Sequence, residues 1–114
     1  MNDRRAEYEL KLFIDDERYP PEDGSVWVVI RNYDETIAFL DSLDESPSFI
    51  SFDNDLGKNS QEGFKIVDWI IEKDLNCGGT WISKNFDYYV HSQNPVRKDY
   101  IIGTLTRYLN FKKG

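Results

Sequence analysis

Mostly apolar runs of four or five residues recur along the chain. Longer, more polar stretches that contain turn-forming residues separate them. These runs occupy residues 10–14, 26–30, 49–52 and 86–90. They are rich in β-branched and aromatic residues, and each is flanked on at least one side by Asn, Asp or Ser. Runs of this length and composition predict buried β-strands.

The stretches after the second, third and fourth runs carry apolar residues at helical spacing. We expect these helices to begin after Asn32, near Glu62 and after Asn94. Glu35 stands three residues after Asn32, as in a capping box, and Pro95 suits the first position of the last helix. Residues 80–85 fit neither the strand nor the helix pattern.

The predicted order is strand, strand, helix, strand, helix, strand, helix. This order predicts an α/β fold in three layers, with a mostly parallel sheet of four to five strands and helices on both faces. A chain of 114 residues is expected to form one domain over 1–114, with its core at about 10–110. The three tryptophans are expected in the core or at its rim rather than in a base-stacking surface.

The charge balance narrows the possible partners. The 14 basic and 21 acidic residues give a net charge of −7, which disfavours binding of duplex nucleic acid by a basic surface. A local pocket for a small phosphorylated ligand remains possible. A single Cys and a single His argue against a zinc site. The apolar runs are too short for a secretory signal or a membrane span, so we expect a cytoplasmic protein with no membrane partner.

Polar residues follow three of the four predicted strands, and parallel strands bring such ends to one edge of a sheet. The residues are Asp15 and Asp16, then Asp53, Asn54 and Asp55, then His91 and Ser92. A single Asp at a strand end commonly only caps a turn, so the joint occurrence is what indicates a site. Four carboxyls in one crevice either stay partly protonated or require a cation, and all-oxygen ligands favour Mg²⁺ or Mn²⁺.

His91 is the candidate for proton transfer at this edge, although a strand-end His can simply be a hydrogen-bonded structural residue. The helix predicted after Asn94 directs backbone N–H groups toward the same edge, where they attract an anion such as phosphate. Arg18 and Arg97 flank two of the clusters and are candidates for contacts with that phosphate. Both arginines also have an ordinary interpretation as solvated surface residues.

Three blocks of the sequence, at residues 12–20, 51–57 and 91–95, resemble the blocks of the cyclic-phosphate-processing receiver-like domain family. They read LFIDDERYP, SFDNDLG and HSQNP. This family occurs in bacteria and phages and is related to response-regulator receivers. The resemblance runs from about Lys11 to Leu109 and implies a flavodoxin-like fold without the usual last strand. The expected lack of that strand and its Lys argues against a phosphorelay role.

The resemblance implies activity on a cyclic phosphate, such as a cyclic nucleotide signal or a cyclic-phosphate RNA end. The matching polar positions are Asp15, Asp16, Arg18, Asp53, Asp55, His91, Ser92 and Asn94. The family usually has His where this chain has Asn54, and if that His serves as a second acid or base, this chain lacks it.

Two functions are compatible with these residues. In the first, a phosphoesterase holds Mg²⁺ or Mn²⁺ with Asp15, Asp16, Asp53 and Asp55. In that enzyme His91 and Asp53 act in catalysis, and the ligand is bound by Arg18, Ser92, Asn94 and Arg97. In the second, the chain is a non-catalytic module that binds or sequesters a phosphorylated small molecule or a protein partner, as a small phage-encoded protein does.

Overall fold

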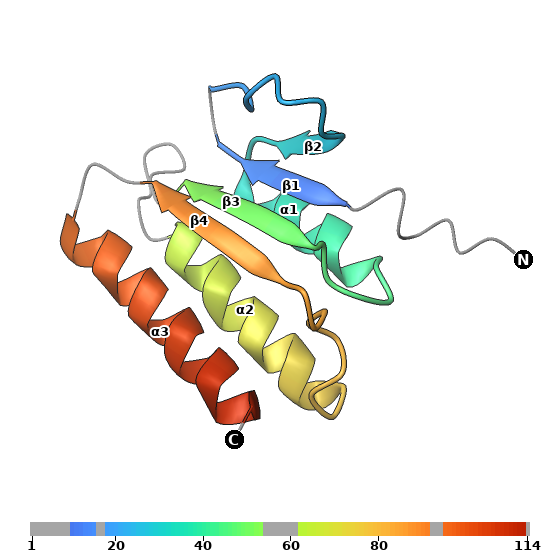
Figure 1. The fold of residues 1–114 in the computed structure, drawn as a ribbon, viewed down its shortest axis with the longest axis vertical. Helices are drawn as coiled ribbons and strands as arrows, with labels where there is room; N and C mark the ends of the chain where they lie inside the picture. The colour runs from blue at the N-terminus through green and yellow to red at the C-terminus, as the bar shows by residue number, and fades with distance from the viewer. Residues whose placement is uncertain (1–9, 16–17, 54–61, 92–94, 114) are drawn as a thin grey trace, which may run out of the picture.

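The described part of the chain forms a four-stranded parallel sheet and three helices (Figure 1). The computed structural model describes residues 10–15, 18–53, 62–91 and 95–113. The elements are β1 (Lys11–Ile14), β2 (Trp27–Ile30), α1 (Tyr33–Asp41), β3 (Phe49–Asp53), α2 (Glu62–Asn76), β4 (Asp87–His91) and α3 (Pro95–Lys113). The predicted strands and helices are confirmed, and residues 80–85 belong to neither kind of element.

Local sequence explains where the helices begin and end. Asn32 is the N-cap of α1, and its Oδ1 accepts a hydrogen bond from Glu35 N at 2.9 Å. Its Nδ2 donates to Glu35 Oε1 at 3.1 Å, so the expected Asn–Glu pair forms through both side chains. After α2, Gly78 and Gly79 have φ angles of +70° and +80°, a backbone conformation that stops a helix and favours glycine.

The direction of each strand connection decides which face of the sheet it crosses. The strand order is β2-β1-β3-β4, and every pair is parallel. The connections from β2 to β3 and from β3 to β4 run in the same direction, so right-handed crossovers place α1 and α2 on one face. The connection from β1 to β2 runs the other way, and its described part, residues 18–26, contains no helix.

The three helices therefore form a single layer on one face of the sheet, with α2 between α1 and α3 (Figure 1). This layer and the sheet residues that face it form the core, whose fully buried members include Leu12, Ile14, Leu40, Ile50, Phe52, Ile66, Ile70, Val90, Ile101 and Leu105. The receiver-like α/β class is confirmed, and the described residues contain no strand after β4. The expectation of helices on both faces is corrected, because the β1–β2 connection supplies no helix in its described part.

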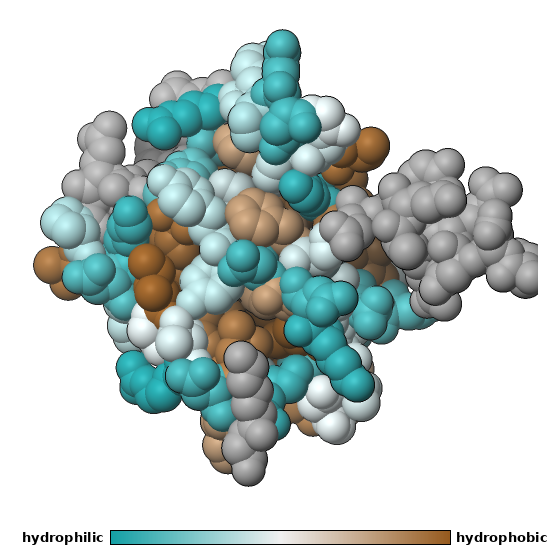
Figure 2. Space-filling model, viewed as in Figure 1, coloured by the Kyte–Doolittle hydropathy of each residue, from teal (hydrophilic) through white to brown (hydrophobic). Residues whose placement is uncertain are grey.

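The opposite face of the sheet is formed by the alternate residues of each strand, and many of them are aromatic. They are Lys11, Phe13, Trp27, Val29, Phe49, Ser51, Asp87, Tyr89 and His91. Figure 2, drawn from the side on which the strands lie in front of α1, shows apolar side chains among polar ones over the middle of the sheet. The described helices all lie on the other face, and residues of the β1–β2 connection border a cavity here together with strand side chains.

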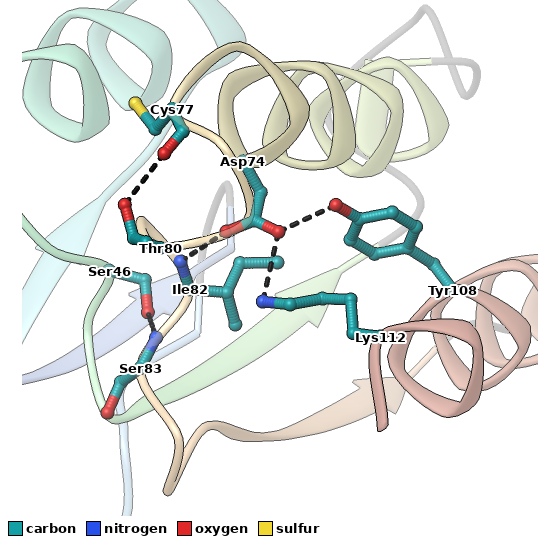
Figure 3. A network of polar contacts seen from close by, with 8 residues as sticks. All are labelled: Ser46, Asp74, Cys77, Thr80, Ile82, Ser83, Tyr108 and Lys112. Carbon is teal, nitrogen blue, oxygen red and sulfur yellow. Dashed lines mark hydrogen bonds and ion pairs between the residues drawn. The ribbon is translucent and has the colours of Figure 1, made fainter. Parts of the chain in front are cut away.

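A buried carboxylate fastens α2 to α3 and to the segment before β4 (Figure 3). Asp74 is fully buried, and its Oδ1 accepts a hydrogen bond from Ile82 N at 2.7 Å. Its Oδ2 accepts one from the Tyr108 hydroxyl at 2.6 Å and lies 2.9 Å from Lys112 Nζ. Burial raises the pKa of the Asp74 carboxyl, but the three donors outweigh burial and bring this pKa below its ordinary value. Burial, together with the neighbouring carboxylate, raises the pKa of Tyr108.

We expect Asp74→Asn to lower the free energy of unfolding by about 2–4 kcal/mol at neutral pH, because it leaves buried donors poorly paired. The lowered pKa means that the carboxylate stabilises the fold above the ordinary Asp range, and that this contribution is lost as the pH falls through the folded-state pKa. Urea unfolding at pH 7 and pH 3 should therefore show a smaller difference between wild type and variant in acid. Glu72→Gln, at an exposed position of the same helix, is the control. A difference that does not change with pH would contradict this account of Asp74.

Candidate functional site

A cavity of about 430 Å³ lies on the sheet face that the helices leave uncovered. Its volume is in the range of small-molecule binding sites. It is lined by residues of all four strands and of the β1–β2 connection: Lys11, Phe13, Arg18, Tyr19, Pro21, Asp23, Trp27, Phe49, Ser51, Tyr89 and His91. The cavity thus extends from the first residues of β1, β2 and β3, which are Lys11, Trp27 and Phe49, to the carboxyl edge, where β4 ends at His91.

Asp15 and His91 face each other at this edge. Asp15 directly follows β1, is 1% exposed, and accepts a hydrogen bond from Arg18 N on its Oδ1 at 2.9 Å. Its Oδ2 lies 3.8 Å from Nε2 of His91, the last residue of β4. Strand β3 separates the two strands in the sheet, so only the parallel pairing of all three brings these residues together.

The imidazole of His91 is held by aromatic neighbours from the same sheet face. Its ring stacks against Phe13 and against Tyr89, with 5.9 Å between ring centroids in both cases. The side chain is 16% exposed. A carboxylate on one side and two rings around it fix the orientation of the imidazole, which a proton-transfer residue requires.

Arg31, which the sequence did not indicate, holds the chain that carries Asp15 and Arg18. Its Nη1 donates to the backbone oxygen of Asp15 at 3.1 Å and also to the backbone oxygen of Arg18. Its guanidinium lies 4.9 Å from the centroid of the Tyr19 ring. Because Asp15 N also donates to Ile30 O at 3.2 Å, the end of β2 positions this part of the site.

The structure brings three of the predicted site residues together: Asp15, His91 and Arg18. The backbone of Asp53 pairs with that of His91, whereas the Asp53 side chain lies outside the described part of the structure. Other predicted residues, namely Asp16, Asn54, Asp55, Ser92 and Asn94, also lie outside the described residues. Arg97 lies in the first turn of α3 and does not line the cavity.

Within the described residues, no three His, Cys, Asp or Glu side chains lie close enough to hold a metal ion. Of the four aspartates expected to bind Mg²⁺ or Mn²⁺, only Asp15 has a described side chain. Its buried carboxylate is the oxygen donor such an ion prefers, so this residue fits one position of a ligand set. The metal remains a prediction.

The strand pattern alone did not reveal the aromatic wall of the cavity. The sequence predicts Phe13, Trp27, Phe49 and Tyr89 only as strand residues, and strands buried on both faces also carry such residues. The available signal was the absence of a helical pattern between the first two strands, which leaves one face without a covering helix. Trp81 is buried in the core as expected, but Trp27 lines the cavity.

A parallel sheet of this order, with an Asp and a His at its carboxyl edge and no described fifth strand, defines a receiver-like α/β domain. The family model of the cyclic-phosphate processing Receiver domain matches residues 10–107, and the chain belongs to this family. No curated protein and no solved structure compared with the chain matches it. Among the described helices, none has the length and apolar character needed to cross a membrane.

We expect Arg31→Gln to loosen the segment that carries Arg18, because the variant loses the guanidinium contacts to two backbone oxygens. The Arg18 amide, which donates to Asp15, should exchange its hydrogen about tenfold faster. Hydrogen exchange read out by mass spectrometry or NMR measures this change. Arg107→Gln, at an exposed position of α3, should leave the exchange of this amide as in the wild type. Equal exchange in both variants would show that Arg31 does not hold the segment.

Proposed function

We propose that this protein is a phosphoesterase that hydrolyses a cyclic phosphate at the carboxyl edge of its sheet. Membership of the cyclic-phosphate processing Receiver family supports a cyclic phosphate as the substrate class. The observation that carries the proposal is the pair formed by Asp15 and His91, with Oδ2 and Nε2 3.8 Å apart at the rim of a ligand-sized cavity. Arg18 lines the same cavity and supplies a positive charge for the phosphate.

The proposed reaction opens the phosphate ring with one molecule of water. The water oxygen forms a bond to phosphorus, and the bond from phosphorus to one ring oxygen breaks. His91 gives a proton to that leaving oxygen, and the attacking water gives up a proton in turn. Asp15 acts as a positioning residue, because its buried carboxylate faces the imidazole and opposes its charge when the ring carries a proton.

The remaining predicted roles belong to the same proposal. Asp53 is the proposed base for the attacking water, since its backbone stands opposite His91 at the edge of the sheet. Ser92, Asn94 and Arg97 are proposed to contact the phosphate together with Arg18. Mg²⁺ or Mn²⁺, held by Asp15 with Asp16, Asp53 and Asp55, would polarise the phosphoryl oxygens and acidify a water molecule.

We expect His91→Ala to lower kcat by roughly 10²–10⁴-fold, the usual effect of removing a positioned proton donor. The Kd of the variant for the ligand should change much less, because Arg18 can still bind the phosphate. The assay measures product from a panel of cyclic mononucleotides, 2′,3′-cyclic-phosphate RNA ends and cyclic dinucleotides. Asn110→Ala, at an exposed position of α3, is the control for handling and folding.

An unchanged kcat in His91→Ala would remove this residue from the mechanism. Tight binding by the wild-type protein without product beyond one equivalent would contradict the enzyme and support a binding module. Melting temperatures of all variants identify any loss that arises from unfolding.

We expect millimolar Mg²⁺ or Mn²⁺ to raise the melting temperature, because an ion that binds only the folded state stabilises it by about 2.7 kcal/mol at a hundredfold excess over Kd. Asp15→Asn should abolish this shift. Asp87→Asn, at the other end of the sheet on β4, should retain it. A melting temperature that stays the same when either ion is added would exclude the proposed metal site.

A further inference from the structure

The cavity beside His91 has an unusual lining. Its described lining residues are Phe, Tyr, Trp, Pro and His together with Lys, Arg, Asp and Ser, and no Leu, Ile, Val or Met is among them. Pockets for acyl chains or apolar peptide side chains are lined largely by aliphatic residues. Flat rings combined with cations are instead the surface on which nucleic-acid bases stack.

The rings at the two ends of this cavity are held in place. Near the β2 edge, Trp27 meets Phe13 and Phe49 edge to face, with centroid separations of 5.8 and 5.9 Å. Asp23 Oδ1 accepts from Trp27 Nε1 at 3.4 Å and from Ser25 N at 2.9 Å. These contacts fix a tryptophan that is only partly buried, so the wall is formed before any ligand arrives.

Near the β4 edge, Tyr89 presents its ring to solvent. Its side chain is 55% exposed although it lies within the sheet, and it stacks against His91. Lys98 Nζ lies 5.9 Å from the centroid of the Tyr89 ring. On the other side of the cavity, Lys11 Nζ lies 5.4 Å from the centroid of the Trp27 ring. The same ammonium group donates a hydrogen bond to Ser25 Oγ at 2.9 Å. Lys11 and Arg18 line the cavity with one carboxylate, Asp23, so its described lining is net positive in a chain of net charge −7.

We propose that this cavity binds the base of a single nucleotide, so that the cyclic phosphate processed at His91 is a cyclic nucleotide rather than a base-free cyclic phosphate. The inference rests on the proposed function and names its substrate class. The base stacks on the aromatic wall between Trp27 and Tyr89, and the phosphate reaches Arg18 and His91 at the carboxyl edge. A volume of about 430 Å³ suits one nucleotide. The negative net charge disfavours a longer strand.

The test uses ligands that the enzyme does not open, so its outcome does not depend on turnover. Adenosine 3′-monophosphate carries a base and a phosphate, whereas glycerol 2-phosphate carries only the phosphate. Binding of each to the full chain is measured by calorimetry. We expect adenosine 3′-monophosphate to bind roughly 5- to 150-fold more tightly, the contribution of one stacked base.

Tyr89→Leu should bring the ratio of the two Kd values close to one. Phe111→Leu, which changes an exposed aromatic residue on α3, should leave the ratio as in the wild type. A ratio near one in the wild type, or a ratio that Tyr89→Leu does not lower, would overturn the proposal. Melting temperatures of both variants establish that each is folded, and Tyr89→Phe, which keeps the ring, should restore the ratio.

Tryptophan fluorescence provides a second, positional readout. Trp27 lines the cavity, while Trp69 and Trp81 pack edge to face at 5.8 Å on the helical side of the sheet. Adenosine 3′-monophosphate should quench the emission of the wild type, and Trp27→Phe should abolish this quenching while calorimetry still detects binding. Quenching that persists in Trp27→Phe would place the base elsewhere and overturn the proposal.

Two further outcomes separate this inference from the proposed function. Base-dependent binding without hydrolysis of adenosine 2′,3′-cyclic phosphate would support the base site and overturn the enzyme. Equal hydrolysis of that compound and of glycerol 1,2-cyclic phosphate would support the enzyme and overturn the base site. A short RNA with a terminal 3′-phosphate that binds more than tenfold tighter than the mononucleotide would overturn the assignment to a single base.

Discussion

The right-handedness of parallel crossovers is the constraint on which the rest of this structure depends. With the strand order β2-β1-β3-β4, α1 and α2 must share one face of the sheet, and α3 joins them beside α2. The connection from β1 to β2 belongs to the other face and supplies no helix in its described part. One face of the sheet therefore becomes the core. The other keeps a cavity that leads to the carboxyl edge.

Two buried carboxylates have different parts in this arrangement. Asp74 is surrounded by Ile82 N, Tyr108 and Lys112, and the donors around it keep it charged while they join two helices to the segment before β4. Asp15 accepts a hydrogen bond from Arg18 N and faces His91 at the edge of the cavity. The first carboxylate lies on the helical side and fixes the fold. The second lies where a ligand can reach its partner imidazole, and it supports the proposed proton transfer.

Much of the candidate site could be predicted because strand ends are visible in a sequence. Asp15 and His91 each follow an apolar run, and parallel pairing places such ends at one edge. Arg31 could not be found this way. It acts through backbone oxygens of Asp15 and Arg18, and a contact between residues that distant in the sequence depends on how β2 aligns with β1. The aromatic wall was missed for a related reason: a strand pattern does not tell a ring buried under a helix from one that lines a cavity.

The sequence by itself determined the elements and their order, because local apolar periodicity, an Asn cap and the glycines after α2 act over a few residues. It also determined the family, which a comparison of the sequence alone shows. Only the tertiary structure decided that all three helices lie in one layer and that Phe13, Trp27, Phe49 and Tyr89 face a cavity. The physical reason is that an apolar strand carries apolar side chains on both faces, so its pattern does not show which face the helices cover. Which face is covered depends on the direction of each crossover and on whether a helix is present to pack there.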